Sequence, residues 1–255
     1  MARRILITGI ARGIGRAIAE KFLENGDMVV GTYFSSEDKA RELLEQYGEE
    51  RVKLLGPYDF QNTDQTNELL TNLMEYSFDS VICNSGMFSD NDDFMNFDLE
   101  EFKRIMNCNF YAAMILCIGL QKNIVNGGSI VIISSNDAFS GAYASMSYSI
   151  SKAALISLTK CLCVNFGSKH IRVNSVSPGA INTDMNTEVQ MDLSPQYTPI
   201  ERVGQPSEVA NVVYFLTSEE ASFINGENIT IDGGFGDVNI LLKNEADDVR
   251  SKKSE

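Results

Sequence analysis

The sequence predicts an α/β fold: a single domain built on a doubly wound, mostly parallel sheet of about seven strands, with helices on both faces. Apolar runs of strand length alternate with amphipathic helical stretches along almost the whole chain. The 255 residues, 44% of them hydrophobic, can bury one sizeable core, and the main body contains no repeat or low-complexity tract.

Each predicted strand is a short apolar run, as expected for a strand that is buried on both faces. We expect strands at residues 4–8, 28–33, 52–57, 80–84, 129–134, 172–177 and 228–231. Between them, apolar residues recur at helical spacing and predict helices at 13–24, 36–47, 63–76, 99–122, 147–166 and 207–217. In a sheet of this kind, ligands bind at the carboxyl ends of the strands.

Two segments fall outside this pattern. Residues 184–203 contain Pro195 and Pro199 and show no clear periodicity, so we expect a loop of the length that often forms a lid. After Gly236 the chain becomes strongly charged. We therefore expect a catalytic domain over residues 1–236, followed by a mobile tail over residues 237–255.

A glycine-rich turn joins the first predicted strand to the first predicted helix. Gly9, Gly13 and Gly15 follow the apolar run that ends at Ile7. Glycine lets the backbone approach a ligand closely, and the free N–H groups of a helix start point at an anion. The turn therefore predicts a phosphate cradle, although a tight strand–helix connection would show similar glycines. No GK[ST] sequence follows, so the turn is not a P-loop.

Ser135, Tyr148 and Lys152 form a candidate acid/base device that needs no histidine. Lys152 follows Tyr148 by four residues, which places both side chains on one face of a helix. A nearby ammonium favours the phenolate, so we expect Lys152 to lower the Tyr148 pKa from about 10 toward neutrality. Ser135 would hold the carbonyl or hydroxyl oxygen of the substrate on the side opposite Tyr148. Alone, the Tyr148/Lys152 spacing also suits an ordinary exposed helix pair.

Taken together, these motifs resemble the short-chain dehydrogenase/reductase family over roughly residues 3–236, and the resemblance implies a Rossmann-like domain. Other segments match the family's usual sequence: Cys83-Asn84-Ser85-Gly86, Asn107-Cys108-Asn109, Ser177-Pro178-Gly179 with Thr183, Gly204–Ala210 and Ile231–Gly234. Cys83 and Ser85 depart from the family's usual Asn and Ala. The resemblance also implies that segment 184–203 folds over the substrate.

The resemblance implies roles for four catalytic residues. Tyr148 would donate a proton to a carbonyl oxygen as hydride arrives, or remove it in the reverse direction. Lys152 would lower the phenol pKa and bind the nicotinamide ribose, and Ser135 would hold the substrate. Asn109 would hold a water that passes protons from solvent to Lys152.

The resemblance also implies a nucleotide site, with Asp59 bonded to the adenine amino group. The residues expected to bind the cofactor are Gly9, Arg12, Gly13, Ile14, Gly15, Tyr33, Asp59, Phe60, Asn84, Ser85, Gly86, Tyr148, Lys152, Pro178, Gly179 and Thr183.

NADP(H) is the expected cofactor. NAD enzymes of this fold commonly place a carboxylate after the second strand, and here that position carries Tyr33. Arg12 supplies a cation for a 2′-phosphate, unless it is only a solvated loop charge. The arginine that often follows the second strand in NADP(H) enzymes of the family is missing.

The composition argues against several classes of binding partner. The formal charge of −14 argues against nucleic acid and anionic membranes. The five cysteines show no CxxC pair, and the lone His170 lies in a predicted loop, so no metal is expected. No apolar run approaches the ~18–20 residues that span a bilayer, and the short apolar start leads directly into the glycine turn. We expect a cytoplasmic protein.

The substrate is expected to be a small molecule that is a ketone or a secondary alcohol. We expect Met87, Phe88, Phe139, Tyr143, Met146, Met185 and Met191 around an apolar pocket. The layout is most like that of 3-oxoacyl-carrier-protein reductases, so a 3-oxoacyl thioester with a carrier docked at Lys169 is the second option, and a sugar or polyol is the third. A catalytically inactive cofactor sensor is the alternative from another class.

The helices at 99–122 and 147–166 carry more apolar residues than one sheet face can cover. Examples are Phe110, Met114, Leu116, Leu155, Leu158, Leu162 and Phe166. Family members pair these helices between subunits. A homo-oligomer, in particular a tetramer, is therefore expected.

Overall fold

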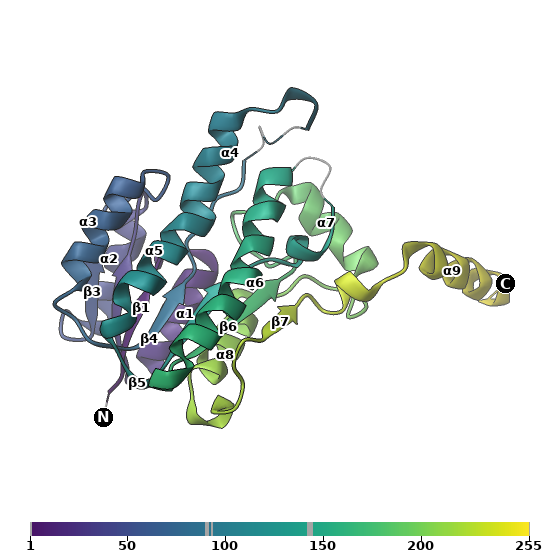
Figure 1. Cartoon of the computed structure of the whole chain (residues 1–255). Helices are drawn as coiled ribbons and strands as arrows, with labels where there is room; N and C mark the ends of the chain where they lie inside the picture. The colour runs from purple at the N-terminus through teal and green to yellow at the C-terminus, as the bar shows by residue number, and fades with distance from the viewer. Residues whose placement is uncertain (1, 90–91, 93, 142–144, 255) are drawn as a thin grey trace.

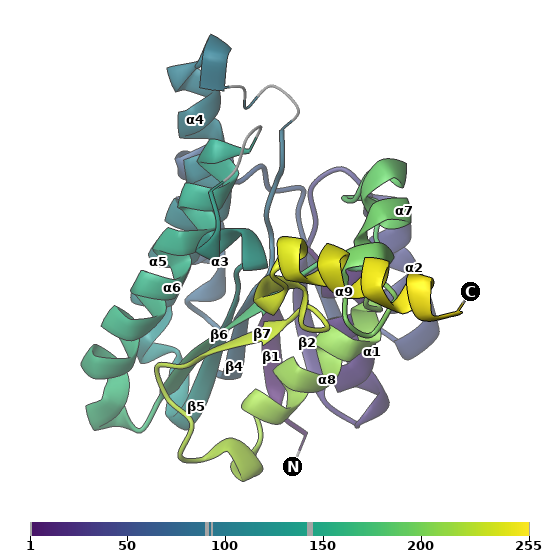
Figure 2. The same ribbon diagram turned by 90° about the vertical axis from the view of Figure 1, so that its right-hand side faces the viewer.

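The computed structural model describes residues 2–89, 92, 94–141 and 145–254, and within them it has one seven-stranded parallel sheet. The strand order is β3-β2-β1-β4-β5-β6-β7, which confirms the predicted doubly wound fold (Figures 1 and 2). The strands are β1 (Arg4–Ile7), β2 (Met28–Thr32), β3 (Val52–Leu55), β4 (Phe78–Cys83), β5 (Ile124–Ile133), β6 (Arg172–Pro178) and β7 (Asn228–Ile231).

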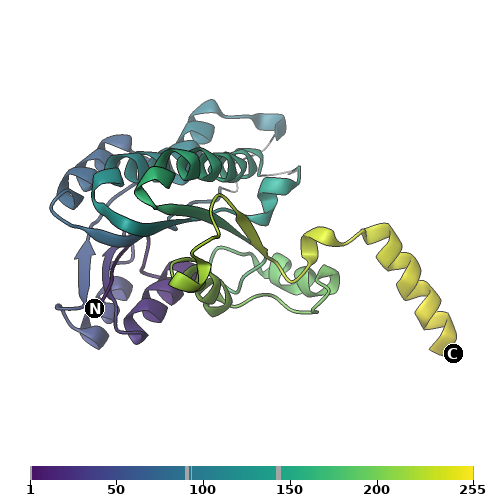
Figure 3. The ribbon, with the colours of Figure 1, turned by 60° about the horizontal axis from the view of Figure 1, so that its bottom comes forward.

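Helices cover both faces of the sheet (Figure 3). They are α1 (Gly13–Glu24), α2 (Glu37–Tyr47), α3 (Thr63–Leu73), α4 (Leu99–Met106), α5 (Ala112–Gly119), α6 (Met146–Phe166), α7 (Glu188–Tyr197), α8 (Pro206–Leu216) and α9 (Ile240–Ser254). Helices α3, α5 and α6 pack on one face, and α1, α2 and α8 pack on the other.

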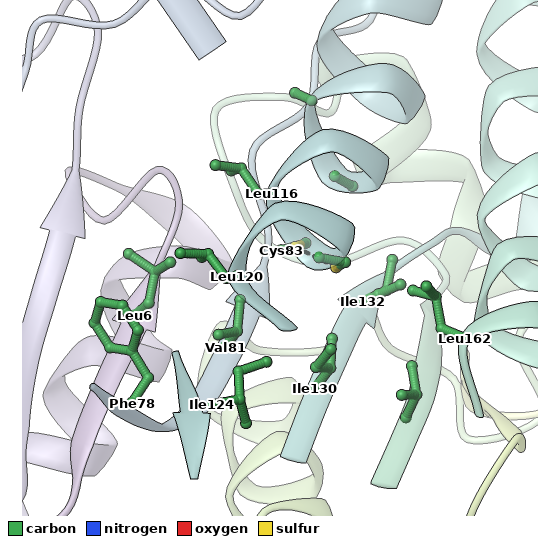
Figure 4. Packing of buried hydrophobic residues seen from close by; sticks show 14 of the residues in the cluster. Leu6, Phe78, Val81, Cys83, Leu116, Leu120, Ile124, Ile130, Ile132 and Leu162 are labelled. Atoms are coloured by element: carbon green, nitrogen blue, oxygen red, sulfur yellow. Dashed lines mark hydrogen bonds between the residues drawn. The ribbon is translucent and has the colours of Figure 1, made fainter. Parts of the chain in front are cut away.

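Side chains that alternate along each strand divide the core between these two layers. Leu6 faces the α3–α5–α6 layer, whereas its neighbours Ile5 and Ile7 face the α1–α2–α8 layer, and all three are fully buried. Figure 4 shows the first layer, with Leu120 just beyond the end of α5 lying against Val81 of β4. Two-sided burial of this kind explains why the strands are continuous apolar runs.

Strand β5 begins five residues earlier than predicted. Gly127 and Gly128 interrupt its apolar pattern, and Gly127 has a φ of 84°. The pairing of β4 with β5 shifts register between Phe78 and Ser80, which accommodates this irregular first half. Because the two glycines break the apolar run, the sequence analysis did not detect the first half of the strand.

The predicted single helix over residues 99–122 is interrupted. Helix α4 ends at Met106, a π-helical turn spans Asn107–Tyr111, and α5 follows. Such wide turns often occur at functional sites. Within this turn, the Asn109 side chain is 1% exposed.

Segment 184–203 contains a helix that the sequence did not predict. Helix α7 spans Glu188–Tyr197, with Pro195 inside it. Proline removes one backbone hydrogen bond and usually breaks a helix interior. Here Pro195 lies two residues before the helix ends, so the loss is confined to the last turn.

The charged tail forms helix α9, which projects away from the body of the molecule (Figures 1 and 3). Lys243 pairs with Asp247, and Lys252 pairs with Asp248, each one helical turn apart. Such pairs stabilise exposed helices by a few tenths of a kcal/mol each. The tail is therefore helical rather than unstructured, and its mobility stays a prediction.

Candidate active site

The loops at the carboxyl ends of the strands surround a cavity of about 650 Å³. Ser135 and every residue predicted to bind the cofactor line it: Gly9, Arg12, Gly13, Ile14, Gly15, Tyr33, Asp59, Phe60, Asn84, Ser85, Gly86, Tyr148, Lys152, Pro178, Gly179 and Thr183. Residues from across the chain therefore meet where the fold predicts a ligand site.

The glycine turn brings the start of α1 against the end of β1. A Cβ atom at Gly15 would lie 2.0 Å from the Gly9 carbonyl oxygen and 2.4 Å from Asn84 Nδ2, so no other residue fits without a shift. Arg12 precedes the helix without a side-chain cap, which leaves the first N–H groups of α1 available to an anion. The turn therefore has the geometry that a phosphate cradle requires, and phosphate binding stays a prediction.

A network of hydrogen bonds joins the loops after β1 and β4. The Thr8 hydroxyl accepts hydrogen bonds from the backbone N–H groups of Asn84 and Ser85, both at 3.0 Å. The Asn84 amide donates to the carbonyl oxygens of Thr8 at 3.0 Å and Gly9 at 3.1 Å. Asn84 thus holds the glycine turn in place as well as lining the cavity.

Lys152 is buried in the wall of the cavity, and its side chain points at the end of β5. Its Nζ donates to the Ile133 carbonyl oxygen at 3.0 Å and lies 5.5 Å from the centre of the Tyr148 ring. Burial lowers the pKa of Lys152 to about 8, although the Cys108 thiol and the Asp137 carboxyl oppose this effect. Near neutral pH the ammonium is therefore close to giving up its proton.

Tyr148 is buried and lies beside Ser135. Burial raises the Tyr148 pKa to about 12, a hydrogen bond with Ser135 lowers it, and the Asp137 carboxylate raises it further. The expectation that Lys152 lowers this pKa toward neutrality is wrong, because the penalty for a buried phenolate dominates. Tyr148 is therefore a protonated donor.

Asp92 fixes the start of α6, a function that the sequence did not reveal. Its carboxylate accepts hydrogen bonds from the Ser147 N–H and hydroxyl, both at 2.6 Å, and from the Tyr148 N–H at 3.2 Å. A carboxylate at a helix N-terminus also interacts favourably with the helix dipole. Asp92 itself is buried. Its neighbours Asp90 and Asp93 lie outside the described residues.

Asn109 lies behind the cavity wall rather than on it. Its Oδ1 accepts from the Met87 N–H at 2.7 Å, and its Nδ2 donates to the Met87 carbonyl and the Ser151 hydroxyl, both at 3.0 Å. The side chain thus ties the Gly86–Met87 loop to α6. Its function in a proton relay stays a prediction.

At the other end of the cavity, Asp184 lies between two cations. Arg12 Nη1 is 3.5 Å from the Asp184 carboxylate, and Lys39 Nζ is 3.7 Å from it. Lys39 lies in the first turn of α2, and the sequence analysis missed it. Its position three residues after Ser36 could have indicated a second cation for the 2′-phosphate, because the arginine that often follows the second strand in NADP(H) enzymes of the family is missing here.

Only part of the predicted apolar pocket is present. Met87, Phe88 and Met185 line the cavity, and the Phe88 ring meets the Tyr148 ring edge-on at 5.6 Å. Phe139, Met146 and Met191 do not line the cavity, and Tyr143 lies outside the described residues. Phe235 and Asp137 line it without having been predicted.

The described residues contain no cluster of three or more His, Cys, Asp or Glu side chains that could hold a metal ion. His170 is not among the residues that line the cavity. One helical stretch in the described part of the chain, Met146–Lys169, is long and apolar enough to cross a membrane. It contains α6, whose residues Leu155 and Leu162 pack in the core.

Comparisons with known proteins agree with this geometry. A family model described as enoyl-(acyl carrier protein) reductase matches residues 9–236. The 3-oxoacyl-[acyl-carrier-protein] reductase of Aquifex aeolicus is 34% identical over 90% of this chain and 95% of its own. The 3alpha-hydroxysteroid dehydrogenase of Mediterraneibacter gnavus is 33% identical over 89% of this chain and 94% of its own. The structure of BdcA in complex with NADPH superposes with a TM-score of 0.84 at 31% identity, over 92% of this chain and 94% of that one.

The protein belongs to the short-chain dehydrogenase/reductase family. It is an oxidoreductase that acts on CH–OH and C=O groups with a nicotinamide cofactor.

Replacing Lys152 with methionine should remove a pH dependence of stability. The unfolded chain keeps this proton up to its usual pKa of 10.5, whereas the folded protein releases it near pH 8. The wild type therefore gains stability as the pH rises between these two values, and the variant lacks that gain. Urea unfolding of both proteins without cofactor would measure it. If the difference in unfolding free energy between the wild type and the variant is the same at pH 8 as at pH 10.5, the lowered pKa of Lys152 is contradicted.

Proposed function

We propose that the enzyme is NADP(H)-dependent and interconverts a ketone and a secondary alcohol on a small, largely apolar molecule, with Tyr148 as the acid/base. One observation carries the proposal: Ser135, Tyr148 and Lys152 line the same cavity as the glycine turn at Gly9–Gly15. A single bound molecule can therefore reach both the anion cradle and the proton donor.

The residues of this chain suit proton transfer to a carbonyl oxygen. Tyr148 is buried and keeps its proton, which it would give to the carbonyl oxygen, while the Ser135 hydroxyl would donate a second hydrogen bond to that oxygen. The Lys152 ammonium would then stabilise the phenolate. A bound nicotinamide would supply the hydride. In the reverse direction, the phenolate removes the proton from the alcohol.

The cavity has the features that a dinucleotide requires. The close approach at Gly15 and the free helix start suit a pyrophosphate, and Arg12 and Lys39 suit a 2′-phosphate. No carboxylate follows β2 at Tyr33, whose ring packs with Ala11 and Ala40. The neighbouring BdcA structure was determined with NADPH.

A 3-oxoacyl thioester is the second candidate, since one relative is a 3-oxoacyl-[acyl-carrier-protein] reductase. The carrier-docking site suggested for Lys169 is not tenable. Lys169 follows the far end of α6, whose 21 residues place it roughly 30 Å from Tyr148. The charge of −14 also opposes an acidic partner. A sugar or polyol ranks third, because Met87, Phe88 and Met185 give the cavity an apolar wall.

Exposed apolar side chains support a homo-oligomer as part of this proposal. Five of the seven residues that suggested it are ordinary core: Leu116, Leu155, Leu158, Leu162 and Phe166. The support comes instead from exposed residues of α5 and α6 and the turn between α4 and α5, namely Tyr111, Ile118, Ile150 and Val164. We expect the protein to sediment as a tetramer at micromolar concentration. We also expect it to be a cytoplasmic enzyme. Detection of only a 28.2 kDa species would exclude the oligomer.

Replacing Tyr148 with phenylalanine should abolish turnover, by several orders of magnitude, and leave NADPH binding intact. The substitution removes the transferable proton and keeps the ring that packs against Phe88. NADPH consumption with a panel of ketones, thioesters and sugars measures turnover, and NADPH fluorescence measures binding. Wild-type turnover in this variant would refute the acid/base function. A wild type that binds NADPH and reduces no member of the panel would instead favour an inactive cofactor sensor.

Replacing Arg12 or Lys39 with alanine should weaken NADPH binding about tenfold or more and leave NADH binding nearly unchanged. Each cation supplies one charge-assisted contact to a 2′-phosphate that NADH lacks. Fluorescence titration with both cofactors measures the effect. Lys53→Ala is the matched control, because this exposed lysine of β3 lines neither the cavity nor the adjoining recess formed by Arg12, Lys39 and Asp184. Equal affinities of the wild type for the two cofactors would contradict the proposed preference.

A further inference from the structure

Asp137 places a carboxyl group at the reacting end of the cavity. It lies two residues after Ser135, in a short 3-10 helix (Asn136–Phe139) that begins three residues after the last residue of β5. Its backbone N–H donates to the Ser135 hydroxyl at 3.2 Å, which fixes the two residues relative to each other. Asp137 is half-buried and lines the cavity together with Tyr148 and Lys152.

Lys152 attracts the Asp137 carboxylate from a distance but does not form an ion pair with it. Among the described residues, no cation forms an ion pair with Asp137. No side chain of these residues donates a hydrogen bond to the Asp137 carboxylate. Burial raises the pKa of Asp137, and only the attraction of Lys152 opposes this effect. The same carboxylate raises the Tyr148 pKa, which hinders formation of the phenolate. A half-buried charge with these costs is best explained by a ligand that pairs with it.

We propose that Asp137 binds a hydrogen-bond donor of the substrate, so that the substrate is a largely apolar ketone or alcohol that carries a hydroxyl or ammonium group close to its reacting carbon. This inference rests on the proposed function and specifies its substrate class. Ser135 holds the carbonyl oxygen, and Asp137 holds the donor next to it. The apolar wall at Met87 and Phe88 contacts the remainder of the molecule.

This geometry discriminates among the three substrate options. The acyl chain of a 3-oxoacyl thioester has no O–H or N–H group beside its 3-oxo carbon, so it would leave Asp137 unpaired. A sugar has the donors but would bury its other hydroxyls against Met87 and Phe88. A functionalised apolar ketone satisfies both the carboxylate and the apolar wall.

The test compares acetophenone with α-hydroxyacetophenone and α-aminoacetophenone. The last two differ from the first by one donor next to the carbonyl carbon. Dissociation constants are measured by NADPH fluorescence in Tyr148→Phe protein saturated with NADPH, so the readout needs no turnover. Failure of the proposed function would appear in the Tyr148→Phe turnover assay, and failure of this inference would appear in the binding ratios.

Both donor-bearing ketones should bind about tenfold or more tightly than acetophenone. Adding Asp137→Leu should remove this preference for both. Asp137→Asn keeps an acceptor but no charge, so it should reduce the preference for the ammonium compound more than for the hydroxyl compound. Asp64→Asn, at an exposed position in the first turn of α3 that does not line the cavity, is the control and should leave both ratios unchanged. Equal binding of the three ketones, or a preference that survives Asp137→Leu, would overturn the inference.

Discussion

The site depends on keeping one ammonium group, that of Lys152, inside the protein at the end of β5. Removing a charge from water costs several kcal/mol unless the surroundings compensate it. Here the compensation is one hydrogen bond to the Ile133 carbonyl, together with the interactions with Cys108 and Asp137. The remaining cost appears as a pKa of about 8. A lysine held near its titration point can take part in proton transfer that a solvated lysine would not.

This arrangement requires α6 to be placed accurately against the sheet, and contacts at its first turns provide that placement. Asp92 holds the first turn through Ser147 and Tyr148. Asn109, in the π-helical turn, holds Ser151 one turn further on. Both contacts come from the region that follows β4, so the same region that forms the cavity wall also fixes the catalytic helix.

The sequence predicted the sheet and the cavity well because both depend on local patterns. Buried strands are apolar runs, and the turn at Gly9–Gly15 is short and rich in glycine. What the sequence missed are contacts between residues distant along the chain. Asp92 caps a helix 55 residues away, and Lys39 meets Asp184 from a distant part of the chain. The Tyr148 pKa was predicted with the wrong sign because burial, which dominates it, follows from the folded structure and not from the Tyr148/Lys152 spacing.

The central claim is that one cavity holds a phosphorylated dinucleotide at one end and a proton donor at the other. A crystal structure of the complex with NADP⁺ tests it most directly. The account predicts the 2′-phosphate in contact with Arg12 and Lys39, the pyrophosphate at the start of α1, and the nicotinamide ribose within hydrogen-bond distance of Lys152. A nucleotide bound with its nicotinamide away from Tyr148, or with its 2′-phosphate free of both cations, would contradict the account.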